Sequence, residues 1–361
     1  MLPRTLFVAR QRTAVAWYRC ALPAEFLGAD WIAIDDRKDG DLVQVAGKDG
    51  VTIPFSDWGT YDVVVLQQPR GATWVRRIRE LQATGTVVLF EIDDYVHAVR
   101  KAVDHDFRRV EDRHALQGLE LAMRAADGLI CSTDWLARRY RAFNQRVHVC
   151  RNGLDLGRYA LTRPPRAAPV IGWAGATGHR NAVQPWLQTV VDVMTARPEV
   201  GFVSIGQPFH RWVAERVGED RCTGIPFTML EAYPAAMTLM DIAIAPAGKS
   251  NFFRGKSDLR FLEAGALGIA TVADPDVYPT LRHGVTGFHA ADPAAAREHL
   301  FTLVDDEGLR ESMGAAAREY VREERDMRVM SAQWAAVLCD VTGREGEAPA
   351  PAPRRKTSLA V

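Results

Sequence analysis

The sequence has few cysteines, no long apolar run and no excess of charge of either sign. Its five cysteines are scattered, without a CxxC pair or the spacing of a metal centre. This excludes a disulfide framework and predicts buried thiols in a reducing compartment. No apolar run is long enough to span a bilayer, and the first residues, MLPRTLFVAR, lead directly into a predicted strand. We therefore expect a cytoplasmic protein whose contact with membranes, if any, is peripheral.

The 45 lysines and arginines are matched by 45 aspartates and glutamates. This balance excludes a protein that binds nucleic acid through its overall charge. A cluster of arginines in the first half keeps open an enzyme that acts on modified nucleic acid, although their helical settings favour a solvated face. The cluster comprises Arg76, Arg77, Arg79, Arg108, Arg109, Arg138, Arg139 and Arg141.

The length of 361 residues predicts two domains. Apolar strands and helical segments alternate in both halves, and the Pro- and Arg-rich stretch at 161–169 separates them. We expect an α/β protein with two doubly wound domains, 1–165 and 166–342, facing each other across a ligand cleft. The last predicted helix, around 329–341, either ends the second domain or crosses back to the first. The tail at 343–361 is rich in Pro, Ala and charge, which predicts disorder.

The stretch at 240–288 is the most informative part of the chain. It predicts a buried strand at 241–246, a basic loop, a helix at 258–267, a turn at Gly268 and a strand at 269–273. Such units bring a helix N-terminus to the carboxyl edge of a parallel sheet, where anions are favoured. Arg254 and Lys256 precede the helix, so two cations would converge there, as in a diphosphate site. The alternative is a surface loop with solvated charges.

Two acidic features add to this picture. Glu263 lies among apolar residues of the predicted helix, and an acid in that setting needs a donor such as a ligand hydroxyl, unless it is on the wet face. Glu91, Asp93 and Asp94 follow a buried strand, where acids require solvent, a ligand or a basic partner. Binding of Mg²⁺ or Mn²⁺ by Asp93 and Asp94 ranks below holding or deprotonating a hydroxyl, or capping the next segment.

Two loops after predicted strands are further candidates for ligand contact. After the first strand we name Gln11, Arg12 and Arg19, with a solvated loop as the equal alternative for the first two. In the second half, the turn within 170–181 contains Gly172, Gly175 and Gly178. It is similar to a phosphate loop but does not fit GxGxxG.

Several segments together resemble the retaining GT-B-fold glycosyltransferases of the group 1, or family-four-like, set. They are GKSDLRFLEAGALGIATV (255–272), VYPTLRHGVTGF (277–288), DIAIAP (241–246), VIGWAG (170–175), FVSIG (202–206) and NGLD (152–155). The resemblance covers the second domain well and the first loosely. It implies a GT-B fold of two Rossmann-like domains, the first binding the acceptor and the second the nucleotide sugar.

The resemblance also implies roles for individual residues. Glu263 would bind the ribose hydroxyls, Arg254 and Lys256 the diphosphate, and Asp93 and Asp94 would act on the acceptor side. The expected catalytic set is Asp93, Asp94, Arg254 and Lys256, and the other expected donor-binding residues are Gly175, His179, Arg180, Ile225, Phe227, Ser257, Glu263 and Thr286.

One position departs from the family pattern. The first acid of the family's paired motif would stand eight positions before Glu263, where this chain has Gly255. That acid helps to position the transferred sugar, so the resemblance does not specify the donor sugar.

The implied activity is transfer of a sugar from a UDP or GDP sugar to a hydroxyl-bearing acceptor, with retention, without a metal and without a tightly bound cofactor. The acceptor would be a glycan, a lipid-linked intermediate, a small molecule or a modified nucleobase. Two alternatives stay open: a non-catalytic sugar-nucleotide-binding or scaffold protein, which Gly255 favours, and an epimerase or hydrolase of the same fold.

Overall fold

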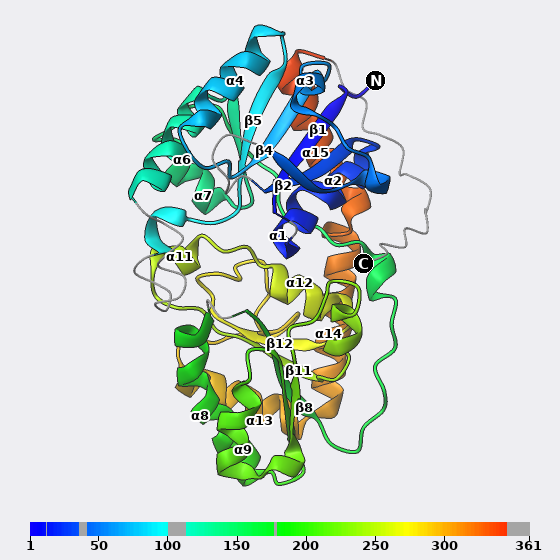
Figure 1. Cartoon of the computed structure of the whole chain (residues 1–361). Coiled ribbons are helices and arrows are strands. Elements are labelled where there is room, and N and C mark those ends of the chain that lie inside the picture. The colour runs from blue at the N-terminus through cyan, green and yellow to red at the C-terminus, as the bar shows by residue number, and fades with distance from the viewer. Residues whose placement is uncertain (12, 36–41, 100–112, 177–178, 345–361) are drawn as a thin grey trace. The chain divides into compact units, whose positions relative to one another are not determined.

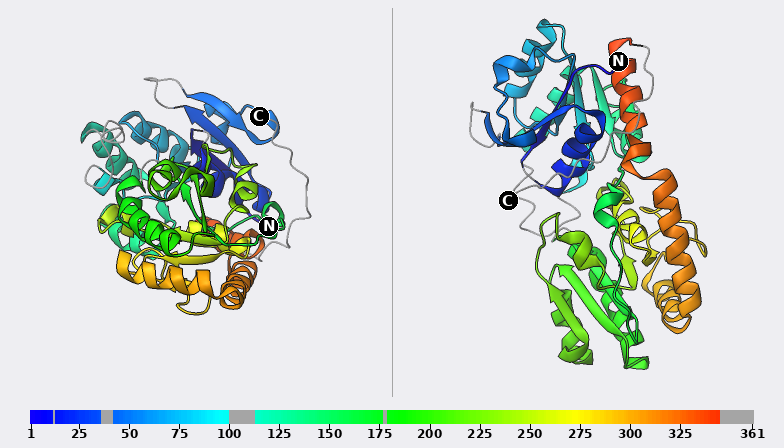
Figure 2. Two further views of the ribbon diagram at one scale, coloured as in Figure 1. Left: turned by 90° about the horizontal axis from the view of Figure 1, so that it is seen from below. Right: turned by 90° about the vertical axis from the view of Figure 1, so that its right-hand side faces the viewer.

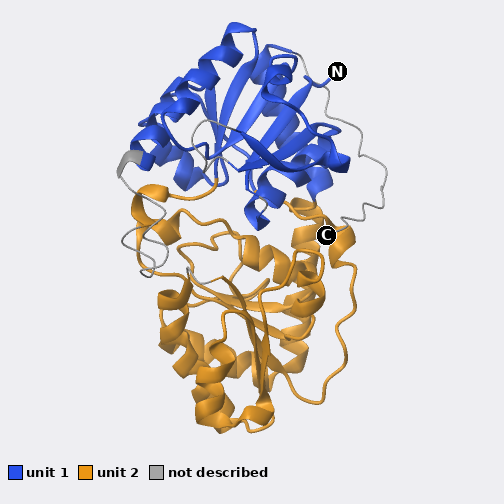
Figure 3. Cartoon of the chain, in the orientation of Figure 1, with its two compact units in different colours: residues 1–92, 114–151, 327–361 blue, residues 93–113, 152–326 orange. Residues whose placement is uncertain are grey.

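The computed structural model describes residues 1–11, 13–35, 42–99, 113–176 and 179–344 (Figure 1). The chain forms two compact units (Figure 3). Unit 1 comprises Met1–Ile92, His114–Arg151 and Met327–Val361, and unit 2 comprises Asp93–Arg113 and Asn152–Asp326. The predicted linker at 161–169 therefore lies within unit 2, after the chain has left unit 1 at Arg151.

Unit 1 is built on a seven-stranded sheet in the order β3-β2-β1-β4-β5-β6-β7. Every pair is parallel except β2 with β3 at one edge. Its central strands are runs of Val, Leu, Ile and Phe buried on both faces, as parallel strands covered by helices require. The strands are β1 (Thr5–Arg10), β2 (Asp30–Asp35), β3 (Val43–Gly47), β4 (Val63–Gln67), β5 (Val87–Ile92), β6 (Gly128–Cys131) and β7 (Val147–Val149).

The last helix of the described residues belongs to unit 1. In α15 (Met327–Thr342), Trp334 packs edge-on against Phe7 of β1, with ring centroids 5.6 Å apart. The helix also contacts α2, and its ribbon, red at the C-terminal end of the colour scale, runs along unit 1 in the right-hand view of Figure 2. The other helical segments of this unit are α1 (Ala14–Ala16), the π-helical turn η1 (Trp17–Ala21), α2 (Leu22–Leu27), η2 (Lys48–Gly50), α3 (Phe55–Trp58), α4 (Thr73–Ala83), α6 (Arg113–Ala125) and α7 (Asp134–Tyr140).

A buried ion pair joins η1 to the end of β5. Arg19 Nε lies 2.6 Å from Glu91 Oε1, and the two side chains are 1% and 0% exposed. Arg19 also donates to the carbonyl of Cys150 at 2.8 Å. We expected Glu91 to meet solvent, a ligand or a basic partner, and in the structure it meets a basic partner, Arg19. Arg19 was expected to face a ligand, and this expectation is wrong because its side chain is buried in the core.

Unit 2 contains a parallel six-stranded sheet in the order β10-β9-β8-β11-β12-β13. The strands are β8 (Val170–Gly175), β9 (Gly201–Gly206), β10 (Cys222–Ile225), β11 (Ile242–Ala245), β12 (Ala270–Ala273) and β13 (Phe288–His289). The helical segments are η3 (Val96–Ala98), η5 (Leu156–Tyr159), α8 (Arg180–Ala196), α9 (Phe209–Val217), η7 (Glu219–Arg221), α10 (Tyr233–Met237), α11 (Asn251–Arg254), α12 (Leu259–Ala266), α13 (Pro293–Asp305) and α14 (Glu307–Glu324).

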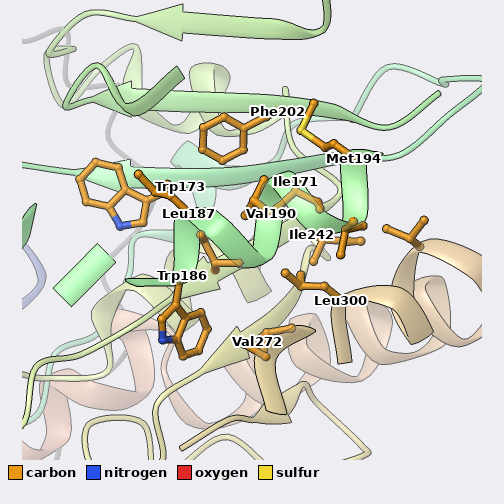
Figure 4. Packing of buried hydrophobic residues seen from close by; sticks show 14 of the residues in the cluster. Ile171, Trp173, Trp186, Leu187, Val190, Met194, Phe202, Ile242, Val272 and Leu300 are labelled. Atoms are coloured by element: carbon orange, nitrogen blue, oxygen red, sulfur yellow. The ribbon is translucent and has the colours of Figure 1, made fainter. Parts of the chain in front are cut away.

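The core of unit 2 lies between its sheet and α8. Leu187 and Val190 of α8 lie beside Ile171 of β8 and Ile242 of β11, and Trp186 of the same helix lies on the side of Val272 (Figure 4). These residues are at most 5% exposed. Burial of each such side chain stabilises the folded unit by roughly 1.5–3 kcal/mol. This packing holds the sheet from whose edge the polar loops extend.

The predicted α/β class is confirmed in both units. The strand–helix–strand order of the stretch at 240–288 is confirmed by β11, α12 and β12, and Gly268 has a left-handed φ of +68° at the turn between the last two. The basic loop was predicted without secondary structure, but it contains the short helix α11. The tail from 345 onward lies outside the described residues.

The Arg19–Glu91 pair leads to a stability prediction. Arg19→Ala removes the cation that pairs with the buried carboxylate of Glu91, and we expect the free energy of unfolding of unit 1 to fall by about 3–5 kcal/mol. Arg76→Ala is the control, because Arg76 is 71% exposed and its pair with Glu80 contributes at most about 0.5 kcal/mol. Urea unfolding followed by circular dichroism measures both, and equal midpoints would contradict the prediction.

Candidate functional site

A buried network holds the start of α12 in unit 2. Arg325 Nη2 lies 2.6 Å from Asp258 Oδ2, with both side chains nearly inaccessible to solvent. Thr280 donates to the same carboxylate oxygen. Arg325 Nη1 donates to the carbonyl of Asn152 at 3.1 Å, and Asn152 Nδ2 donates to Ser257 Oγ at 2.8 Å. Because Asp258 is used in this way, its side chain does not cap α12.

Lys256 lies two residues before this anchor and pairs with Asp94. Its Nζ is 2.6 Å from Oδ1 and 2.8 Å from Oδ2, and each side chain is about one quarter exposed. The ammonium group also lies over the ring of Phe252, 4.4 Å from its centroid. The structure thus brings together two predicted site residues that are 162 positions apart. Asp94 was expected in the first domain, but its segment belongs to unit 2.

Arg254 has a different setting from Lys256. It ends α11, and its Nε lies 3.5 Å from Asp276 Oδ2 in a pair whose side chains are 46% and 43% exposed. A solvent-exposed pair of this kind is weak and can be exchanged readily for another anion. Its predicted part in binding a diphosphate stays a prediction.

Arg260 was not identified from the sequence. It stands near the start of α12 and is half-buried, with its guanidinium over the ring of Trp173 at 5.6 Å. A Cβ atom on Gly175 would come within 2.7 Å of Arg260 Nη2. Gly175 therefore gives this arginine room at the carboxyl end of β8. With the residues that the structure describes, Arg260 forms no ion pair.

His179 precedes α8 and lies close to the same cations. Its ring is 5.6 Å from that of Phe253, and its Nδ1 is inaccessible to solvent without a hydrogen-bond partner among the described residues. Burial first, and then the positive charges of Arg260 and Lys256, lower the pKa of His179 well below its ordinary value of 6.5. The imidazole is therefore neutral at physiological pH.

Glu263 is 4% exposed in the middle of α12. Tyr233 of α10 donates its hydroxyl to Glu263 Oε2 at 3.3 Å. Burial, followed by the nearby charge of Glu263, raises the pKa of Tyr233 well above 10.0, so the phenol keeps its proton. The alternative that Glu263 lies on the wet face of its helix is wrong.

The other predicted binding residues have varied settings. Ile225 is half-buried at the end of β10, whereas Phe227 is 74% exposed. Thr286 is fully buried, and its hydroxyl accepts from the backbone N–H of Arg282 at 2.8 Å within a turn. Arg180 is exposed at the start of α8, and Asp93 is half-buried. Four further residues that we named, Arg12, Gly178, Arg108 and Arg109, lie outside the described residues.

Comparison with known proteins fits this geometry at the level of the fold. No protein-family profile matches the sequence, and no curated protein is significantly similar to it. Several solved structures match over nearly their whole length. HepE of Anabaena, solved in complex with UDP-glucose, aligns with 94% of this chain and all of its own at 14% identity and a TM-score of 0.65.

The chain has the GT-B fold. Two further structures agree: sucrose-phosphate synthase of Thermosynechococcus elongatus, at 12% identity and a TM-score of 0.67, and a glycosyltransferase of Rickettsia africae, at 13% and 0.63. Each covers 94% of this chain and at least 98% of its own. The fold predicted from the sequence is therefore confirmed.

Two features of this GT-B chain concern metals and membranes. Across its described ranges there is no group of three or more His, Cys, Asp or Glu side chains arranged to hold a metal ion. None of the described helices has the length and apolarity needed to cross a bilayer.

The setting of His179 predicts a pH dependence of stability. Since the folded pKa lies below the unfolded value, the unfolded chain binds more protons below pH 6.5, and stability falls as the pH falls. Between pH 6.5 and 5, the free energy of unfolding of the wild type should fall more steeply than that of His179→Gln. The difference is at most about 1.4 kcal/mol per pH unit. Parallel curves from urea unfolding across this range would contradict the assignment.

Proposed function

We propose that this chain is a glycosyltransferase that moves a sugar from a nucleoside diphosphate sugar to a hydroxyl-bearing acceptor. The observation that carries the proposal is the arrangement around α12 in unit 2: Lys256 before its first turn and the buried carboxylate of Glu263 further along. The GT-B fold supports it, because HepE shares the fold and was solved with UDP-glucose. UDP is accordingly our first choice of nucleotide, with GDP as the second.

The main chemical task in this reaction is to stabilise the leaving diphosphate. Negative charge develops on its oxygens as the bond to the sugar breaks, and fixed cations and N–H groups lower that barrier. Lys256 supplies a cation. The first turn of α12 supplies N–H groups that the side chain of its N-cap residue, Asp258, does not cap. We propose that these groups stabilise the leaving diphosphate without help from a metal, and that the sugar is transferred with retention.

Asp94 and Lys256 act together in this proposal. The Asp94 carboxylate orients the lysine ammonium before the donor arrives, and it then shares the cation with the diphosphate. Asp93, its neighbour in sequence, is the group we propose to approach the acceptor hydroxyl. The acceptor itself is a glycan, a lipid-linked intermediate, a small molecule or a modified nucleobase.

Glu263 binds the ribose in this proposal. A carboxylate accepts hydrogen bonds from two adjacent hydroxyl groups, and Tyr233 fixes its orientation by donating to Oε2. The remaining donor contacts that we propose are Gly175, His179, Arg180, Ser257 and Arg254 near the phosphates, and Ile225, Phe227 and Thr286 near the base. We propose that the enzyme works in the cytoplasm.

One residue favours a second candidate function. Gly255 stands where the resembling family has an acid that positions the sugar. A protein that binds a sugar nucleotide without turning it over would keep Glu263 and Lys256 and lose that acid. Turnover assays on the wild type separate this function from the first.

Glu263→Gln tests the ribose contact. The substitution keeps the size of the side chain and removes its charge, so we expect the Kd for the preferred nucleoside diphosphate to rise about 10- to 100-fold, as loss of hydrogen bonds to a charged group implies. A thermal-shift screen against UDP, GDP, ADP and dTDP, with and without EDTA, first identifies that nucleotide. The control is Glu311→Gln, whose side chain is exposed on α14. Unchanged affinity in Glu263→Gln would remove this residue from the site.

Lys256→Met tests stabilisation of the leaving group. We expect kcat to fall about 10²- to 10³-fold, the usual effect of losing one group that stabilises developing charge, with little change in Tm. Lys249→Met is the matched control, because Lys249 is 64% exposed and pairs with Asp274 instead. If Lys256→Met unfolds the protein while Lys249→Met does not, the role of Lys256 is structural.

A further inference from the structure

Arg260 is a cation that the protein's own acids leave without an ion pair. The nearest candidates are on the same helix and at its start, but both are committed elsewhere: Asp258 pairs with Arg325, and Glu263 accepts from Tyr233. Among described residues, Arg260 makes no ion pair, although it is half-buried. A partly desolvated guanidinium favours an anion beside it.

Two residues of β8 shape the position of the guanidinium. Trp173 of β8 provides a flat aromatic surface beneath it, at 5.6 Å, which orients the group through a cation–π contact. Gly175, at the end of the same strand, has no side chain in the way, since a Cβ there would lie 2.7 Å from Nη2. The cation is thus held at the carboxyl end of the central strand β8, where parallel α/β sheets bind their ligands.

Two other groups with unfilled bonding capacity act on the same place. His179 has a solvent-inaccessible Nδ1 without a partner among the described residues, and it experiences the charges of both Arg260 and Lys256. Lys256 pairs with Asp94, and each of the two side chains is about one quarter exposed. Gathering two cations and an imidazole costs free energy through mutual repulsion, and a multiply charged anion removes that cost.

We propose that Arg260 binds the diphosphate of the donor, with His179 donating a hydrogen bond from Nδ1 to the same group and Lys256 contacting it from the α11 side. This inference rests on the proposed function and adds to it a further cation, Arg260, which the sequence did not indicate. The planar guanidinium forms two parallel hydrogen bonds to phosphate oxygens, a geometry that a lysine cannot reproduce. Arg260 therefore sets the orientation of the diphosphate, whereas Lys256 acts as a point charge.

The test is isothermal titration calorimetry of the full chain with four probes: UDP, GDP, inorganic pyrophosphate and uridine. We expect Arg260→Gln to weaken binding of the preferred nucleoside diphosphate and of pyrophosphate at least tenfold, and to leave any uridine binding unchanged. Arg260→Lys should recover only part of the loss. Arg297→Gln is the control, because Arg297 is half-exposed and pairs with Asp192 on the surface of the same unit.

A second readout concerns protons. Bound diphosphate should raise the affinity of His179 for a proton, so binding near pH 6 should take up protons in the wild type and fewer in His179→Gln. Titrations in buffers of different ionisation enthalpy measure this uptake. If Arg260 binds the diphosphate, Arg260→Gln should lose this proton uptake together with the bound diphosphate. If Arg260 has only a structural role, the proton uptake should remain in that variant.

The outcomes separate the two proposals. If the wild type binds a nucleoside diphosphate and Arg260→Gln binds it equally well, the role of Arg260 is wrong and the proposed function stands. If the wild type binds none of the nucleoside diphosphates, the proposed function fails. Should Arg260→Gln not fold, Arg260→Lys decides the question, because undiminished diphosphate affinity in that variant contradicts bidentate binding.

Discussion

The buried ion pair between Arg325 and Asp258 is the constraint on which the candidate site depends. It takes the N-cap acid of α12 away from the helix and fixes it to the segment that follows α14. The same arginine reaches the carbonyl of Asn152, whose side chain in turn holds Ser257. Three distant parts of unit 2 thus define the path of the loop that carries Lys256. Without that anchor, the loop would lose the contacts at Ser257 and Asp258 that fix its path directly after Lys256.

The chemistry of α12 follows from this arrangement. Along eight residues, the helix presents uncapped N–H groups, the guanidinium of Arg260 and the buried carboxylate of Glu263. The guanidinium and the carboxylate have opposite charges, and each has a contact of its own: the guanidinium lies over Trp173, and the carboxylate accepts a hydrogen bond from Tyr233. A ligand with an anionic part and hydroxyl groups matches that order, and a nucleoside diphosphate has both.

Much of the fold could be predicted from the sequence, and less of the site. Short apolar runs such as those of β4, β11 and β12, bounded by polar or turn residues, indicate buried parallel strands, because helices cover both faces of such strands. Lys256 and Glu263 could be found because a basic loop and an acid among apolar residues are local signals. The partnership of Lys256 with Asp94 could not, since it joins residues 162 apart through tertiary packing. Arg260 gave no signal at all, because a charged residue in the first turn of a helix resembles any solvated charge.

The return of α15 to unit 1 has a consequence for synthesis of the protein. Trp334, which packs on Phe7 of the first strand, is among the last described residues to leave the ribosome. Unit 2 has all of its strands once Asp326 has been made, whereas unit 1 lacks a helix until α15 is complete at Thr342. The second unit can therefore reach its native state while the first is still open, which reverses the usual order in which domains mature from the N-terminus.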